Sequence, residues 1–153
     1  MALVGPDRGR QGQARKIEVL VVDDHQMVRQ GLRSLMEDEP DVEVAGEAAS
    51  GREMMCRIRE RDWDVVVLDI TLPDASGLEL IAEVKAVRPG LPVVILSMHP
   101  ASEYADTALA LGASGYVAKE DAAAKVVQAI RAAAGRARYV GGPLPEENGS
   151  RGG

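Results

Sequence analysis

Short apolar runs alternate along this chain with segments whose apolar residues recur every three or four positions. Compact β-branched runs are typical of buried strands, and the wider spacing is typical of helices with one buried face. The pattern predicts strands at residues 17–22, 42–45, 65–68, 93–96 and 115–118. A helix is expected after each of them, so the chain consists of five strand–helix units.

Start and stop signals support these helices. Ser50 with Glu53, and Ser76 with Glu79, match the capping box that opens a helix. Pro89-Gly90 is expected to end the third helix, and Pro100 suits the first turn of a fourth that runs to about residue 111. Asp121 is expected to cap the last helix.

Alternating strands and helices predict an α/β fold, a doubly wound five-stranded parallel sheet covered on both faces. The segment 42–45 alternates apolar and polar residues, as an edge strand does, whereas 65–68 and 93–96 are apolar throughout. The strand order 2-1-3-4-5 places these segments accordingly.

Composition narrows the class of protein. The chain has 153 residues, 46% hydrophobic and 27% charged, which suits one water-soluble domain with a real core. Its net charge of -6 argues against direct nucleic-acid binding, and no apolar run approaches membrane-spanning length. The N-terminus lacks a secretory signal and Cys56 is the only cysteine, so a cytoplasmic location is expected.

The ends of the chain differ in composition from its middle. Residues 1–16 are rich in Gly, Arg and Gln and are interpreted as a flexible tail. Residues 138–153 are mostly Gly, Pro and polar residues and are interpreted as a linker or disordered tail. The folded domain is therefore expected to span residues 17–137.

Polar residues follow four of the five predicted strands. Asp23 and Asp24 follow the first, Asp69 the third, Ser97 the fourth and Lys119 the fifth. Because the carboxyl ends of parallel strands meet at one edge of the sheet, these side chains should converge on one crevice. The edge strand supplies nothing comparable.

Clustered carboxylates either raise a pKa or hold a cation. Carboxylate oxygens suit Mg²⁺ best and Mn²⁺ nearly as well. Asp69, at the end of a central strand, is the natural nucleophile for a phosphoryl group, with Lys119 and Ser97 facing its oxygens. Each residue alone has an ordinary reading as a cap, turn or solvated charge, and the prediction depends on the joint pattern.

With these residues in place, the chain resembles a two-component response regulator receiver domain with a flavodoxin-like (CheY-like) fold. The matching segments are VLVVDDH, VVVLDITLPDASGLEL, VVILSMH and GASGYVAKE. SMHPASEYADTALALGASGYVAKE and AAGRARYV are similar to the NarL/FixJ (LuxR-type) subfamily, whose receivers precede a DNA-binding domain. The resemblance covers residues 17–137.

The resemblance implies a role for each site residue. Asp69 is the phosphoacceptor, and a sensor histidine kinase is the donor. Asp24 and Asp69 ligate Mg²⁺ directly, Asp23 helps to hold it through water, and the backbone carbonyl of Thr71 completes the metal site.

A second set of roles concerns switching. The resemblance implies that Ser97 and Lys119 bind the phosphoryl group, and that Tyr116 changes rotamer as Ser97 moves. The output face is then the fourth helix, fifth strand and fifth helix, with possible homodimerisation on phosphorylation. Such a chain is a signalling phosphoacceptor that catalyses only its own phosphorylation and dephosphorylation. Glu120 stands where many receivers have proline, which leaves the backbone after Lys119 open.

Other readings stay open at this point. A Mg²⁺-dependent phosphatase with an Asp nucleophile expects a second Asp where Thr71 stands. A flavin- or nucleotide-binding domain expects a Gly- or hydroxyl-rich loop in place of Asp23-Asp24-His25. A pseudo-receiver used only for docking is the third alternative. The output is either that of a stand-alone receiver or transcription through a DNA-binding domain that the chain lacks.

Overall fold

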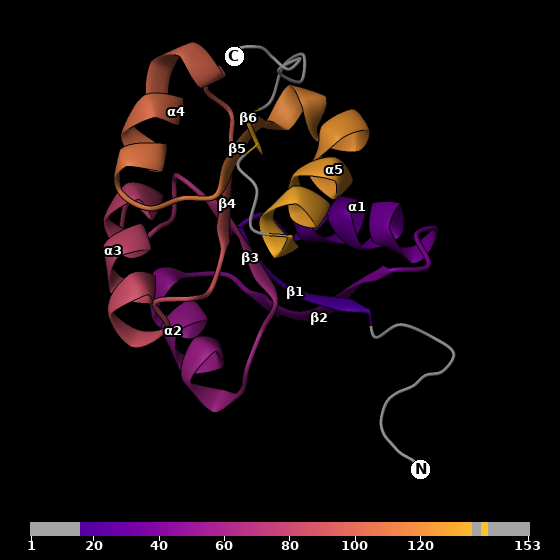
Figure 1. Ribbon diagram of the computed structural model, residues 1–153, viewed down its shortest axis with the longest axis horizontal. Coiled ribbons are helices and arrows are strands. Elements are labelled where there is room, and N and C mark those ends of the chain that lie inside the picture. Colours follow the sequence, from indigo (N-terminus) through magenta and orange to yellow (C-terminus); the bar gives the residue numbers. More distant parts are fainter. Residues whose placement is uncertain (1–15, 136–138, 141–153) are drawn as a thin grey trace.

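The six strands of this protein form one parallel sheet, in a computed structural model that describes residues 16–135 and 139–140 (Figure 1). Neighbouring strands follow the order β2-β1-β3-β4-β5-β6. The strands are β1 Ile17–Val22, β2 Val42–Ala48, β3 Val65–Asp69, β4 Val93–Ser97, β5 Gly115–Ala118 and β6 Tyr139–Val140. The predicted fold class and the order 2-1-3-4-5 are confirmed, and β6 is an unpredicted addition beside β5.

Helices cover both faces of the sheet. In the described part of the chain they are α1 Gln26–Glu37, α2 Gly51–Glu60, α3 Gly77–Val87, α4 Ala101–Ala110 and α5 Ala122–Ala134. Figure 1 shows α1 and α5 on one side of the sheet and α2, α3 and α4 on the other. This is the doubly wound arrangement, in which the loops after the strands gather at one edge.

Alternate residues of the central strands pack into two apolar cores. Leu20, Leu68 and Ile95 belong to the core with α2, α3 and α4, whereas Val19, Val67 and Leu96 belong to the core with α1 and α5. Each of these side chains is at most 1% exposed. Burial of one such side chain is worth about 1.5 to 3 kcal/mol, so the sheet is a rigid base for the loops at its edge.

The second strand is longer than the sequence pattern predicted. It extends from Val42 to Ala48, and its register with β1 shifts between Val19 and Leu20. A Cβ atom on Gly46 would lie 2.5 Å from the Trp63 ring, so glycine admits the indole at this irregular point. The alternation that marked residues 42–45 breaks at the irregularity, which explains why the pattern stopped too early.

Two of the three predicted helix caps are confirmed. Ser50 Oγ accepts a hydrogen bond from Glu53 N at 3.1 Å, and Ser76 Oγ accepts one from Leu78 N at 3.2 Å. The capping role of Asp121 is wrong, since its side chain makes no cap hydrogen bond. Its backbone (φ -100°, ψ 1°) continues a 3₁₀ turn over Lys119–Asp121, whereas a capping side chain needs an extended backbone.

The predicted domain boundaries remain a prediction. Residues 1–15, 136–138 and 141–153, which include most of the expected tail and linker, lie outside the described residues. Within the described part, Tyr139 and Val140 pair with Gly115 and Tyr116 of β5. None of the described helices has the length and apolar character that a bilayer crossing requires.

Candidate functional site

Four charged side chains meet at the carboxyl edge of the sheet, where the sequence predicted a crevice. Carboxylate oxygens of Asp23, Asp24 and Asp69 lie within 4.8 Å of one another. Lys119 Nζ lies 3.0 Å from Asp23 Oδ2 and 3.3 Å from Asp69 Oδ2. The residues at or just after the ends of β1, β3 and β5 therefore lie together, because these strands are close to one another in the sheet.

Burial makes this cluster electrostatically unusual. The side chains of Asp23 and Asp69 are 2% and 3% exposed, and that of Asp24 is 33% exposed. Burial, with a further contribution from Asp23, raises the pKa of Asp69 against the opposing effects of the Thr71 N–H and Lys119. Burial alone would lower the pKa of Lys119, but the contacts with Asp23 and Asp69 outweigh it and raise that pKa.

One oxygen of the cluster lacks a hydrogen-bond donor among the described residues. It is Asp23 Oδ2, which is buried and has an ion-pair contact with Lys119 Nζ at 3.0 Å. Carboxylate oxygens from three aspartates, one of them buried without a hydrogen bond, are the kind of donor set that a hard divalent cation requires. The residues present therefore fit Mg²⁺.

His25 borders the same cluster. Its backbone N–H donates to Asp23 Oδ1 at 2.9 Å, and its ring Nδ1 lies 3.1 Å from that oxygen and 3.2 Å from Asp24 Oδ1. It occupies the N-cap position of α1, and its side chain is 66% exposed. The residue holds the loop after β1 in place through its backbone.

The β3–α3 loop holds the other oxygen of the central carboxylate. Thr71 N donates to Asp69 Oδ1 at 3.1 Å, and Gly77 N donates to the Ile70 carbonyl at 2.7 Å. A Cβ atom on Gly77 would lie 2.5 Å from the Asp69 carbonyl oxygen, so only glycine permits this close approach of helix and strand. The loop thereby fixes Asp69 at the mouth of the crevice.

Ser97 and Tyr116 both bond to the loop between β4 and α4. Ser97 is buried at the end of β4, and its Oγ accepts a hydrogen bond from His99 N at 3.0 Å. The Tyr116 ring is fully buried, and its hydroxyl donates to the His99 carbonyl at 2.9 Å. Both side chains therefore hold the β4–α4 loop, and the Tyr116 ring is turned into the core of the domain.

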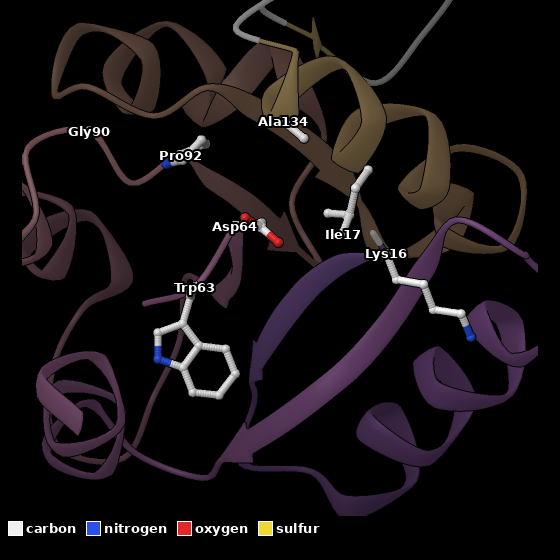
Figure 2. A pocket seen from close by; sticks show the side chains of 7 residues that line it. All are labelled: Lys16, Ile17, Trp63, Asp64, Gly90, Pro92 and Ala134. Carbon is white, nitrogen blue, oxygen red and sulfur yellow. The ribbon is translucent and has the colours of Figure 1, made fainter. Parts of the chain in front are cut away.

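Among the hollows in the surface of the described residues, two have volumes of about 280 Å³ each. One lies between the β3–α3 loop, which follows Asp69, and the start of α4, and is lined by Thr71, His99 and Tyr104 among others. The other lies at the opposite end of the strands, beside Trp63 and Asp64, with the Lys16 ammonium directed away from both (Figure 2). The second hollow contains none of the predicted site residues.

One contribution to the site, from the edge strand, was not predicted from the sequence. Glu47 near the end of β2 accepts a hydrogen bond from Arg29 Nε at 2.8 Å, and Arg29 Nη1 donates to the Asp23 carbonyl at 2.6 Å. An arginine on the first turns of a helix that begins beside two acids was the available signal. Its partner in β2 became evident only from the sheet register.

Fold and site together define a doubly wound α/β domain with a lysine-balanced cluster of carboxylates at the carboxyl edge of its sheet. Residues 19–131 match the family model of the response regulator receiver domain, and the chain belongs to that family. The resemblance stated from the sequence is therefore confirmed, and the protein is a receiver domain of the kind found in two-component signalling.

Relatives place the chain near the LuxR-type subfamily. It is 38% identical to the DNA-binding transcriptional activator DevR/DosR of Mycobacterium tuberculosis over 75% of this chain and 53% of that protein. It is 32% identical to the response regulator UvrY of Escherichia coli over 86% of this chain and 60% of that protein. The chain thus spans between half and two thirds of these relatives.

Solved structures agree with this placement. A two-component response regulator of the LuxR family from Aurantimonas is 38% identical, with a TM-score of 0.77 over 81% of this chain and 89% of that one. The non-phosphorylated receiver domain of the stress response regulator RcsB from Escherichia coli is 25% identical, with a TM-score of 0.77 over 84% and 100% of the two chains. Sequence and fold therefore support the same subfamily.

Proposed function

We propose that this chain accepts a phosphoryl group on Asp69 in a Mg²⁺-dependent reaction, with a sensor histidine kinase as the donor. The observation that supports it most directly is the convergence of Asp23, Asp24, Asp69 and Lys119 at one edge of the sheet. A purely structural role would not explain this cluster, because three clustered carboxylates repel one another.

The metal would be held by Asp23, Asp24 and Asp69 with the backbone carbonyl of Thr71, and Mn²⁺ suits the same donors. When bound, the cation supplies positive charge to the phosphoryl oxygens as charge develops on them. The remaining steps, bond formation and charge pairing, belong to residues of the chain. One Asp69 oxygen forms the new P–O bond while the bond from phosphorus to the donor breaks, and Lys119 stays close enough to pair with a phosphoryl oxygen.

The site supports self-catalysed phosphorylation and dephosphorylation and no other turnover. A phosphatase with an Asp nucleophile requires a second acid two residues later, and Thr71 stands there. Lack of sustained turnover of p-nitrophenyl phosphate would agree with this assignment.

Ser97 and Tyr116 are proposed as the switch residues. A phosphoryl group on Asp69 adds oxygens that need donors, and the Ser97 hydroxyl, now bonded to the β4–α4 loop, is a candidate besides Lys119. Movement of that loop would displace Tyr116 through its hydrogen bond to the His99 carbonyl. The displacement would then reach α4, β5 and α5. β6 pairs with β5, so a change in β5 would reach Tyr139 and Val140 as well.

The whole protein's activity is a further proposal. One relative is named a DNA-binding transcriptional activator, and another is named a transcriptional regulatory protein. We propose that the receiver unit spans residues 17–137, works in the cytoplasm, and controls transcription through a DNA-binding domain, with homodimerisation on phosphorylation. A solved structure of two RcsB dimers bound to two parallel DNAs supports this arrangement in a relative.

The chemistry is tested by intact mass after incubation with Mg²⁺ and acetyl phosphate. The wild-type chain should gain one phosphoryl group, and the gain should vanish with EDTA and in Asp69→Asn. Asp106→Asn, which changes an exposed aspartate on α4, is the matched control and should be modified like the wild type. Undiminished uptake by Asp69→Asn would refute the assignment of the acceptor.

The switch is tested separately by NMR. Beryllofluoride with Mg²⁺ should shift the resonances of residues 97–130, and unchanged shifts there would count against the proposed face. Sedimentation of the same sample reports whether the activated chain forms a dimer.

A further inference from the structure

Arg29 connects three segments that build the acidic site. The residue lies on α1, and its Nε donates to Glu47 Oε1 of β2 at 2.8 Å. Its Nη1 donates to the backbone carbonyl of Asp23 at 2.6 Å. The side chain is 16% exposed, so these contacts are largely shielded from water.

Glu47 is itself fixed by a second arginine. Arg33, one turn further along α1, donates from Nε to Glu47 Oε2 at 3.0 Å and also contacts that oxygen through Nη2. Hydrogen bonds from Arg33 and then Arg29 keep the pKa of Glu47 below its usual range, so the carboxylate stays charged at neutral pH. A charged and doubly held Glu47 keeps the Arg29 guanidinium aimed at the loop after β1.

The backbone of Asp23 is consequently held on both sides. Its N–H donates to the Ala48 carbonyl at 3.0 Å, and its C=O accepts from Arg29. That carbonyl belongs to the peptide group whose N–H is on Asp24, and peptide groups are planar. Fixing the carbonyl therefore fixes the direction in which the chain enters Asp24 and presents its carboxylate.

We infer that Arg29 is a positioning residue for the cation site, which it orients through the Asp23–Asp24 peptide, with Glu47 as its anchor. The inference rests on the proposed function for its metal, although the contacts themselves do not depend on it. It also gives the edge strand a part in the site.

The charge of Arg29 and its geometry predict opposite effects on Mg²⁺ affinity. A guanidinium near a cation site repels the cation, so loss of the charge alone would tighten binding. Loss of an outer group that orients metal ligands weakens binding, typically by 10- to 100-fold. The sign of the change in affinity therefore separates the two explanations.

The experiment compares Arg29→Met with Arg33→Met. Both variants lose one cation and one partner of Glu47, but only Arg29 reaches the Asp23 carbonyl. Calorimetric titration with Mg²⁺ should show roughly tenfold weaker binding in Arg29→Met and a change below about twofold in Arg33→Met. Arg29→Lys keeps the charge but lacks the planar fork that spans both partners, so it should weaken binding too.

A second readout uses metal-free protein. The Asp24 amide should exchange its hydrogen faster in Arg29→Met than in the wild type and Arg33→Met, and thermal melting should show that each variant is folded. If Arg29→Met destabilises the fold too far, Glu47→Gln provides the same test by weakening the anchor while its size is kept.

Unchanged or tighter Mg²⁺ binding in Arg29→Met would overturn the inference, as would equal losses in both arginine variants. If the wild type failed to bind Mg²⁺, the proposed function would fall. The exchange rate of the Asp24 amide would then still decide whether Arg29 positions the loop.

Discussion

Replacement of Asp69 by asparagine should stabilise the metal-free protein at neutral pH, although it removes the central residue of the site. At an effective dielectric constant near 20, Asp23 at up to 4.8 Å repels Asp69 by about 3.5 kcal/mol or more. Lys119 at 3.3 Å attracts it by about 5 kcal/mol. These two charge interactions nearly cancel.

Desolvation then decides the sign. The Asp69 side chain is 3% exposed, and withdrawal of a carboxylate from water costs several kcal/mol even after relaxation. Asparagine keeps an oxygen to accept from Thr71 N without that penalty. We expect a net gain of about 1 to 2 kcal/mol, which for a domain of this size raises Tm by about 4 to 8 °C.

The pH dependence provides an internal check. Because the folded-state pKa of Asp69 is raised, mainly by burial, the folded protein binds this proton more tightly than the unfolded chain does. The free energy of unfolding of the wild type is therefore lower above the raised pKa, and it increases as the pH falls through that pKa. The Tm gap between Asp69→Asn and the wild type should shrink on acidification and close near the ordinary aspartate pKa of about 3.9.

The assay is thermal melting from pH 7 to pH 4 in EDTA, and again with excess Mg²⁺. A cation at 100 times its dissociation constant should stabilise the wild type by about 2.7 kcal/mol and Asp69→Asn by much less. Asp106→Asn controls for removal of an exposed negative charge. A variant less stable than the wild type at pH 7, or a gap independent of pH, would refute the view that burial of Asp69 opposes folding.

Three further changes test the surroundings of the site. Gly77→Ala should destabilise the fold by roughly 1 to 3 kcal/mol in urea, because its Cβ would lie 2.5 Å from the Asp69 carbonyl oxygen, and an unchanged midpoint would contradict this. Tyr116→Phe should lose about 1 kcal/mol with the bond to the His99 carbonyl, and equal urea stability would mean that this bond contributes nothing. Lys119→Met should lose about 3 kcal/mol in EDTA and recover part of it with Mg²⁺, and the absence of recovery would argue against a cation site.

The sequence was sufficient for the parts of the fold and site that depend on local patterns. An apolar run that ends in an acid, as at Asp69, marks both a buried strand and the edge at which its ligand site lies. The same rule located Asp23 and Lys119, since parallel strands end together. Neighbouring strands then brought these charges into contact without any need to know the loops.

Features that depend on pairing distant segments were not accessible. The partnership of Arg29 with Glu47 requires the β1–β2 register, which an irregularity beside Gly46 shifts by one residue. Asp121 failed as a cap because the chain turns through a 3₁₀ segment before α5. The peptide bond after Lys119, left open from the sequence, is trans, as are all others in the described residues.

Stability and cation binding in this domain both depend on the same cluster of buried charges. Three carboxylates face one lysine, so the metal-free cluster carries excess negative charge that folding must tolerate. Asp69→Asn removes part of that excess and Lys119→Met increases it, so their effects on metal-free stability should have opposite signs. Excess Mg²⁺ should narrow the difference between them, because the cation relieves repulsion in Lys119→Met and finds one ligand fewer in Asp69→Asn. A purely structural cluster would show two losses and no such convergence.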